Sequence, residues 1–175
     1  MDVLLAVASK RDVRAYSGEA IAPETERRIL DAGRLAGSAR NRQPCRFVVA
    51  EGAARDAVAR AVYSPPIVLD AALAVTLVVT PGGGLVDFDA GRAAQSMMLA
   101  AWAEGVASCP NGIADRGAID RALGLEEPER AVVVLAFGRP PVARDPARRS
   151  AEEWSGRVRR LPLEALVRRV GSPAA

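Results

Sequence analysis

Apolar and polar positions follow two different periods along this chain, and the two periods predict helices and strands. A helical stripe of apolar residues runs through residues 23–36. The longest helical pattern covers residues 87–104 and is apolar on almost every side, which predicts a central buried helix or a dimer interface. Mostly apolar and β-branched runs at 46–50, 74–80 and 131–138 predict three strands. The last two are predicted to be buried, the run at 74–80 on both faces.

Local end signals sharpen several of these boundaries. Asp2 is placed as the N-cap of a short first helix, and Asp115 opens another helix that Gly124 closes. Residues 52–63 read as a helix that Ser64-Pro65-Pro66 ends. Ser150 and Glu153 form a capping-box pattern, and residues 161–170 keep an amphipathic stripe that predicts a tail wrapped around a partner subunit.

Helices that alternate with three or more strands predict an α+β fold, with a mixed central sheet flanked by helices around a long buried helix. At 175 residues the chain is predicted to form a single domain, 1–175, with repeats and low-complexity segments lacking. No strand–helix–strand unit carries a dinucleotide fingerprint. Pro81-Gly82-Gly83-Gly84 also departs from the P-loop pattern, so it predicts a flexible turn.

Composition narrows the chemistry. The chain has no histidine, which removes the Ser-His and Cys-His nucleophile arrangements, the usual zinc ligands and the commonest general base at neutral pH. Its two cysteines, Cys45 and Cys109, are too few for a disulfide framework or a metal site and predict free, mostly buried thiols. An enzyme of this composition is expected to take its chemistry from a cofactor, with no metal.

Charge and hydropathy patterns bear on partners and location. The formal net charge is +3, and the basic side chains lack the lysine tract, aromatic interleaving or helix-turn-helix signature of a nucleic-acid binder. Charged or polar residues interrupt the longest apolar stretches, and the N-terminus lacks the order of a signal peptide. We therefore expect a cytoplasmic protein that binds neither nucleic acid nor membrane.

A polar loop at residues 38–43, Ser-Ala-Arg-Asn-Arg-Gln, holds the densest set of hydrogen-bonding side chains in the chain. A hydroxyl, two carboxamides and two guanidiniums within six residues can bind an electron-rich planar ligand. Pro44 pushes Gln43 toward an extended conformation. By composition alone the segment is either a binding loop or an ordinary helix-to-strand connection.

The motif Ser38-x-x-Asn41-x-Gln43-Pro44, which follows a basic cluster at residues 10–14, resembles the nitroreductase family of flavin mononucleotide (FMN) oxidoreductases. The resemblance extends over most of the chain. It implies the nitroreductase-like fold, an intertwined homodimer with two FMN sites at the interface. It also implies an enzyme that takes hydride from NAD(P)H at flavin N5 and passes electrons to a nitro, quinone or similar small acceptor.

The resemblance also implies where the flavin is held. Lys10 and Arg11 match the phosphate side, Arg14 the N1 and O2 edge of the ring, and Arg148-Arg149 further basic residues that clamp the phosphate. The segment 106–113, VASCPNGI, would cross the ring as a loop with backbone N–H groups near N5 and O4. The implied cofactor-binding residues are Lys10, Arg11, Asp12, Arg14, Ser38, Ala39, Asn41, Gln43, Ser108, Cys109, Pro110, Asn111, Gly112, Arg148 and Arg149.

Two positions depart from the family pattern. Asp12 stands where the family most often has serine, and a carboxylate beside a phosphate is unfavourable unless a neighbouring cation neutralises it. Cys45 replaces a bulky aromatic residue. Three alternatives therefore stay open: a flavin-fragmenting enzyme, a deazaflavin-dependent enzyme, and a non-catalytic protein that binds or stores flavin.

Overall fold

The computed structural model describes residues 1–82 and 85–171, and part of the predicted glycine turn, residues 83–84, lies outside them. Four strands form one sheet in the order β1-β2-β4-β3. They are β1 (Cys45–Val49), β2 (Leu73–Val79), β3 (Ala107–Asn111) and β4 (Arg130–Gly138). The helices are α1 (Val3–Ser9), α2 (Pro23–Arg34), α3 (Gly52–Arg60), α4 (Pro65–Leu69), α5 (Val86–Ala103), α6 (Arg116–Leu123), α7 (Ala151–Ser155) and α8 (Leu163–Leu166).

All neighbouring strands of the sheet pair antiparallel. The parallel component of the expected mixed sheet is limited, among the described residues, to one bridge between Asp12 and Ser108. That bridge carries the N-terminal segment along the free side of β3, where the Val13 N–H donates to the Ser108 carbonyl at 3.1 Å. The sheet position of Asp12 therefore depends on a contact with a residue far along the chain.

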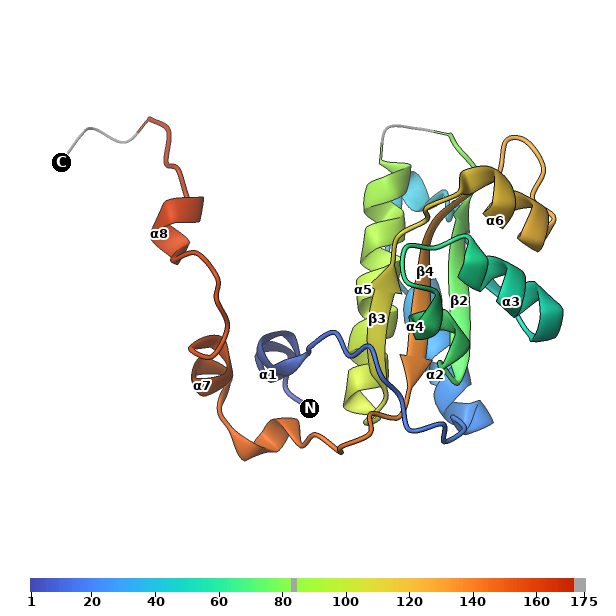
Figure 1. Ribbon diagram of the computed structural model, residues 1–175. Coiled ribbons are helices and arrows are strands. Elements are labelled where there is room, and N and C mark those ends of the chain that lie inside the picture. Colours follow the sequence, from blue (N-terminus) through green and yellow to red (C-terminus); the bar gives the residue numbers. More distant parts are fainter. Residues whose placement is uncertain (83–84, 172–175) are drawn as a thin grey trace.

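Helices cover both faces of the sheet, which gives three layers (Figure 1). All seven residues of β2 are buried, as its continuous apolar run predicts. Leu73, Val75, Leu77 and Val79 pack with α5 and with Ile29 of α2 on one face. Ala74 packs on the other face with residues of α3, α4 and α6. The two largest core clusters thus lie on opposite sides of the sheet, and a third, smaller cluster contains Cys109 and Ala136.

Most of the predicted end signals are confirmed, but Ser64-Pro65-Pro66 begins α4 and does not end α3. The Asp2 and Asp115 side chains cap α1 and α6, and Gly124 closes α6 in the left-handed conformation. The capping box of Ser150 and Glu153 opens α7. These signals act within one turn of helix, so the sequence carries them almost without reference to the rest of the molecule.

Two element predictions were wrong. The helix expected over residues 52–63 ends at Arg60, because Val62 pairs with Ile113 and the Tyr63 N–H donates to the Gly112 carbonyl. The segment expected to be a loop at 106–113 contains strand β3, which pairs with β4 along its whole length. In both cases pairing with a distant segment decides the local conformation.

The tail contains little regular secondary structure. Only Leu163–Leu166 is helical in the segment expected to be amphipathic over 161–170. After β4 the chain leaves the body of the protein and runs past α1 as an arm of residues 145–171, which we call the C-terminal arm (Figure 1). The exposed apolar side chains of the arm are Leu161, Leu163, Leu166, Val167 and Val170. No helix in the described residues is long and apolar enough to span a membrane.

Candidate functional site

The loop at 38–43 is a tight turn with an unusual backbone. Arg40, Asn41 and Gln43 have φ values of 52°, 53° and 51°, in the left-handed region that side chains other than glycine rarely adopt. The prediction that Gln43 is extended was therefore wrong. The Ser38 hydroxyl accepts a hydrogen bond from the Gln43 N–H at 2.9 Å, and this bond closes the turn and holds Gln43 in place.

A buried carboxylate fastens this loop to α5. Asp89 is only 5% exposed, and its Oδ2 accepts a hydrogen bond from the Ala39 N–H at 2.9 Å. Arg92 approaches the same carboxylate at 3.8 Å. Asp89 is not among the site residues predicted from the sequence, because one acidic residue in the first turn of an apolar helix also fits a simple interaction with the helix dipole.

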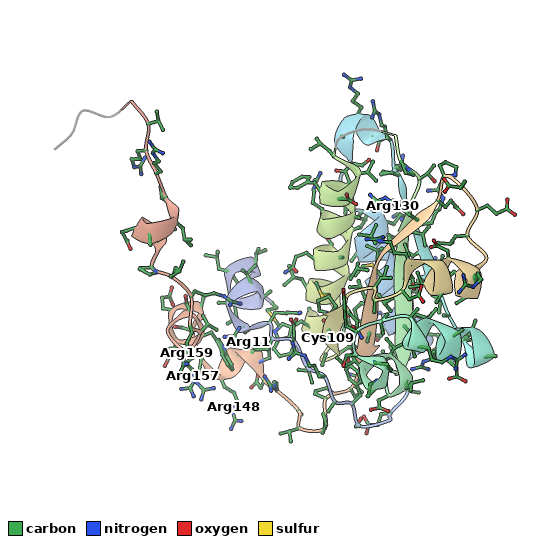
Figure 2. All side chains as sticks on the ribbon, turned by 45° about the horizontal axis from the view of Figure 1, so that its top comes forward. Arg11, Cys109, Arg130, Arg148, Arg157 and Arg159 are labelled. Carbon is green, nitrogen blue, oxygen red and sulfur yellow. The ribbon has the colours of Figure 1, made fainter. Side chains whose placement is uncertain are left out.

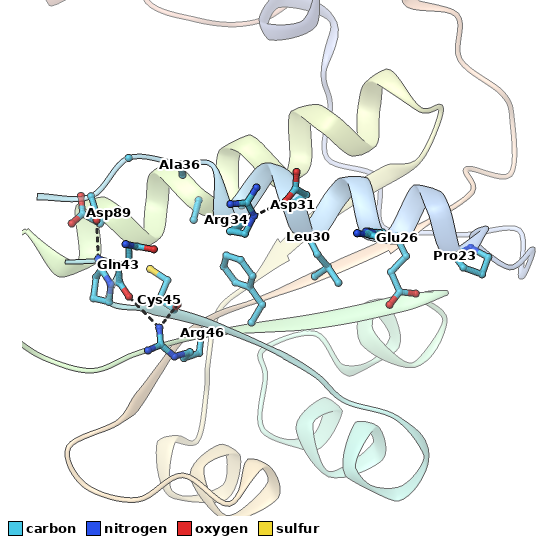
Figure 3. A pocket seen from close by; sticks show the side chains of 17 residues that line it. Pro23, Glu26, Leu30, Asp31, Arg34, Ala36, Gln43, Cys45, Arg46 and Asp89 are labelled. Carbon is cyan, nitrogen blue, oxygen red and sulfur yellow. Dashed lines mark hydrogen bonds and ion pairs between the residues drawn. The ribbon is translucent and has the colours of Figure 1, made fainter. Parts of the chain in front are cut away.

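A cleft of about 630 Å³ opens beside the loop, between α2 and β1. Asp89 and Gln43 lie at one end of this cleft, and Pro23 and Glu26 lie at the other (Figure 3). Cys45 lines the cleft half-buried, and burial together with the nearby charge of Asp89 raises the pKa of its thiol. A raised pKa argues against a nucleophilic role for Cys45, since the thiolate is the reactive form.

A second group of predicted residues lies at the N-terminal segment and β3. The Lys10 ammonium pairs with the Asp12 carboxylate and also lies 3.6 Å from the Met98 sulfur of α5. The backbone of Asp12 forms a parallel β-bridge with the backbone of Ser108. The Ser108 Oγ is buried and has no hydrogen-bond partner in the described part of the chain. Asp12 is therefore neutralised by Lys10, and Ser108 has an unused donor and acceptor beside it.

The remaining β3 residues differ in what they can offer a ligand. Cys109 is buried against Ala136, and burial followed by the charge of Asp12 raises the pKa of its thiol. The Asn111 side chain accepts from the Ser64 N–H and donates to the Ser64 carbonyl, so its carboxamide is already engaged. Pro110 and Gly112 are exposed, and a methyl group on Gly112 would lie 3.0 Å from the Tyr63 ring.

Arginines from the two ends of the chain meet at Trp154 of α7. The Arg11 and Arg149 guanidiniums lie 5.6 and 5.0 Å from the centre of its ring. Arg11 also donates to the Trp154 carbonyl at 3.2 Å, and the Trp154 indole N–H donates to the Pro146 carbonyl at 2.8 Å. Trp154 is not among the site residues predicted from the sequence, where its only signal is an aromatic residue just after a capping box.

This cluster gathers positive charge. Burial and the nearby charges of Arg160 and Arg144 lower the pKa of Arg11. Figure 2 shows Arg148, Arg157 and Arg159 on the arm, on the same side of the molecule as Arg11. No ion pair links Arg11 or Arg149 to a carboxylate in residues 1–82 and 85–171. The arrangement suits an anionic ligand.

The two groups of residues lie on different sides of α5 in one chain. The 38–43 loop attaches to α5 at Asp89, whereas Lys10 contacts it at Met98. These positions are nine residues apart, which is about 2.5 turns and about 13 Å along the helix axis. A half-integral number of turns puts them on opposite sides, so one copy does not bring all the predicted residues together.

Comparison with known proteins gives this arrangement a family. The model of the Nitroreductase family matches residues 7–81 and 85–139, which is most of the chain. The chain belongs to the nitroreductase family. A search of curated proteins found no match.

Solved structures support the nitroreductase fold across nearly the whole chain. A protein named as a nitroreductase from Desulfovibrio desulfuricans, solved in complex with FMN, is 27% identical, with 99% of each chain covered and a TM-score of 0.82. The NADPH:FMN oxidoreductase of Vibrio harveyi, complexed with NAD⁺, is 20% identical. That match covers 97% of this chain and 77% of the other, with a TM-score of 0.80.

A third similar structure is a nitroreductase family protein from Clostridium difficile 630. It is 23% identical, with 96% of this chain and 98% of the other covered, and its TM-score is 0.79. The protein therefore has the nitroreductase fold, as expected from the sequence.

Proposed function

We propose that this protein is an FMN-dependent oxidoreductase that uses NAD(P)H and a nitro, quinone or similar small acceptor. The observation that carries the proposal is the family match, together with a basic cluster and a polar loop built from the residues that the family motif predicts. The relatives named above include one solved with FMN and one named as an NADPH:FMN oxidoreductase. When bound, FMN supplies the redox chemistry by accepting hydride at N5 and passing electrons to the acceptor.

The cluster around Trp154 fits the phosphate end of FMN. A guanidinium has five N–H donors, and Arg11 uses three of them on the carbonyls of Ala8, Lys10 and Trp154. Two donors therefore remain for a phosphate oxygen, and Arg149 adds a second guanidinium on the same ring. Arg148, which is exposed next to it, completes the basic segment at this end.

The N-terminal segment and β3 fit the ring end. Pro110 and Gly112 are exposed, so their backbone is open to a ligand, whereas the Ser108 hydroxyl is buried. Arg14 is exposed two residues beyond Asp12 and supplies a fixed positive charge. A cation at the N1 and O2 edge stabilises the negative charge that the reduced ring carries, and so favours reduction.

The separation across α5 supports a homodimer. The Ser38–Gln43 loop of one copy reaches a flavin held by Lys10, Arg11 and Arg14 only if that flavin belongs to a second copy. Exposed apolar side chains are available for the contact, including Phe88 on α5 and Leu163 on the arm, 63% and 68% exposed. We infer that the C-terminal tail, about residues 150–175, wraps the partner subunit. We also infer that each flavin site uses both chains.

Purification followed by absorption spectroscopy tests the cofactor, and anaerobic titration with NADPH and NADH tests the chemistry. We expect flavin absorbance in the purified protein or after FMN is added, and bleaching by at least one nicotinamide. A protein that takes up no FMN would refute the proposal. A bound flavin that stays oxidised under excess NADPH and NADH would favour the storage alternative.

Sedimentation tests the shared site. We expect a homodimer whose FMN binds with two equivalent sites per dimer. A stable monomer that binds FMN with full affinity would contradict the two-chain arrangement, because the 38–43 loop would then contribute nothing to that site.

A further inference from the structure

We propose that Asp89 is a positioning residue for the flavin site, acting through the 38–43 loop. The inference rests on the proposed FMN function, but its structural basis is independent of any ligand. Asp89 is a charged residue, 5% exposed, in a helix that otherwise buries apolar side chains. A buried carboxylate is unfavourable unless it is paired and hydrogen-bonded. Its presence in this helix therefore points to a role for its hydrogen bond.

Asp89 accepts its hydrogen bond from the backbone of the 38–43 loop, where the strained turn of that loop begins. Its acceptor contact is the Ala39 N–H at 2.9 Å, one residue before Arg40 adopts its left-handed backbone. Three residues other than glycine hold positive φ within four positions, and such strain persists only where the surroundings over-determine the conformation. Among the described contacts that hold the turn, the Asp89 carboxylate accepts from the Ala39 N–H and the Ser38 hydroxyl accepts from the Gln43 N–H. The Arg42 side chain also donates to the Gly82 carbonyl, and the Arg46 side chain donates to the Gln43 carbonyl.

The hydrogen bonds of Ser38 and Asp89 hold the loop in different ways. Ser38 closes the turn upon itself, so it shapes the loop without placing it. Asp89 belongs to α5, so it alone of the two ties the turn to the helix that we infer to lie at the subunit contact. Loss of the Asp89 charge should therefore leave the turn intact but weaken its attachment to α5, so that the turn shifts more readily relative to the flavin.

A simpler role for Asp89 is a favourable interaction with the N-terminal dipole of α5. The chain offers a matched control for this role, because Asp87 also lies in the first turn of α5 but is exposed and pairs with Arg130. Asp87→Asn removes a charge from the same helix end and leaves the loop contacts untouched.

The test compares wild type, Asp89→Asn and Asp87→Asn by FMN titration and by amide hydrogen exchange of the ligand-free protein. Asn keeps the shape and an acceptor oxygen but gives up the charge-assisted bond. We expect Asp89→Asn to weaken FMN binding by about 10- to 100-fold and to speed exchange of the Ala39 amide. We expect Asp87→Asn to change both by less than about 2-fold.

Each outcome decides the matter. Unchanged FMN affinity in Asp89→Asn, or equal losses in the two variants, would overturn the proposal, since the charge would then act on the helix alone. Unchanged exchange of the Ala39 amide would overturn it as well. If wild type itself takes up no FMN, the proposed function fails, and the exchange experiment still decides whether Asp89 positions the loop.

Discussion

Replacing Trp154 with leucine should lower the affinity for FMN by weakening its phosphate contacts, without changing the contacts to the flavin ring. The substitution removes two cation–π contacts, at 5.6 Å from Arg11 and 5.0 Å from Arg149, and the indole hydrogen bond to Pro146. Each cation–π contact at an exposed site contributes about 0.5–1 kcal/mol, and a hydrogen bond contributes about 0.5–1.5 kcal/mol. The sum is about 1.5–3.5 kcal/mol.

Only part of that sum should reach the ligand. Trp154 is half-exposed, and Arg11 keeps its bonds to the carbonyls of Ala8 and Lys10 after the substitution. The lower end of the range is therefore expected, which corresponds to about a tenfold weaker affinity for FMN. The cause would be lost orientation of the two guanidiniums, since neither charge is removed.

Riboflavin, which lacks the phosphate, is the discriminating ligand. Fluorescence titrations of wild type and Trp154→Leu with FMN and with riboflavin should show the loss for FMN alone. Trp154→Phe keeps an aromatic ring but loses the indole donor, so its FMN affinity should fall between the other two. Equal losses for FMN and riboflavin, or no loss for either, would refute the phosphate role of the Trp154 cluster.

Three further predictions concern charge. Arg14→Ala should slow flavin reduction and make the flavin potential more negative, because a charge-assisted contact worth about 1.5–3 kcal/mol is lost. Stopped-flow kinetics and redox titration would measure these two effects. An unchanged potential would exclude Arg14 from the ring edge. Asp12→Ser should weaken FMN binding and lower the unfolding free energy by about 1–2 kcal/mol, because the Lys10 side chain, 9% exposed, loses its partner; tighter binding in calorimetry would mean instead that Asp12 opposes the phosphate. Burial raises the pKa of Tyr16, whose hydroxyl donates to the Ala136 carbonyl at 3.1 Å, so the folded state favours the protonated phenol. Its stabilising effect is present below the unfolded-state pKa of about 10 and is lost as pH rises beyond it, so urea unfolding should show a fall in stability above about pH 10 that is smaller in Tyr16→Phe.

Residue types alone left the loop at 38–43 as either a binding loop or an ordinary connection. The resemblance to the nitroreductase family named the basic segment at 10–14, this loop and Arg148-Arg149 as flavin contacts. The chain matches that family, and the contacts of these residues with flavin stay predictions. The signals missed were Asp89 and Trp154. Each is a single residue whose partner lies far away in the sequence, Ala39 for Asp89 and Arg11 for Trp154.

The sequence by itself determined those features whose hydrogen bonds close within a few residues. The caps at Asp2 and Asp115, the capping box at Ser150 and the closing Gly124 are examples, because a side chain and its backbone partner less than one helical turn apart meet in almost any fold. The apolar run of β2 also predicted a strand buried on both faces, although the hydrogen bonds of this strand go to β1 and β4.

Only the tertiary structure decided where distant segments pair and which predicted residues meet. Strand β3 exists because β4 supplies its partners, and the 52–63 segment stops being helical where Val62 and Tyr63 meet the chain just beyond β3. Likewise the 38–43 loop and Lys10 came to opposite sides of α5 because each is held by a different turn of that helix. The free energy of such contacts depends on closing long loops of chain, and no local pattern of residues records which closures the folded protein makes.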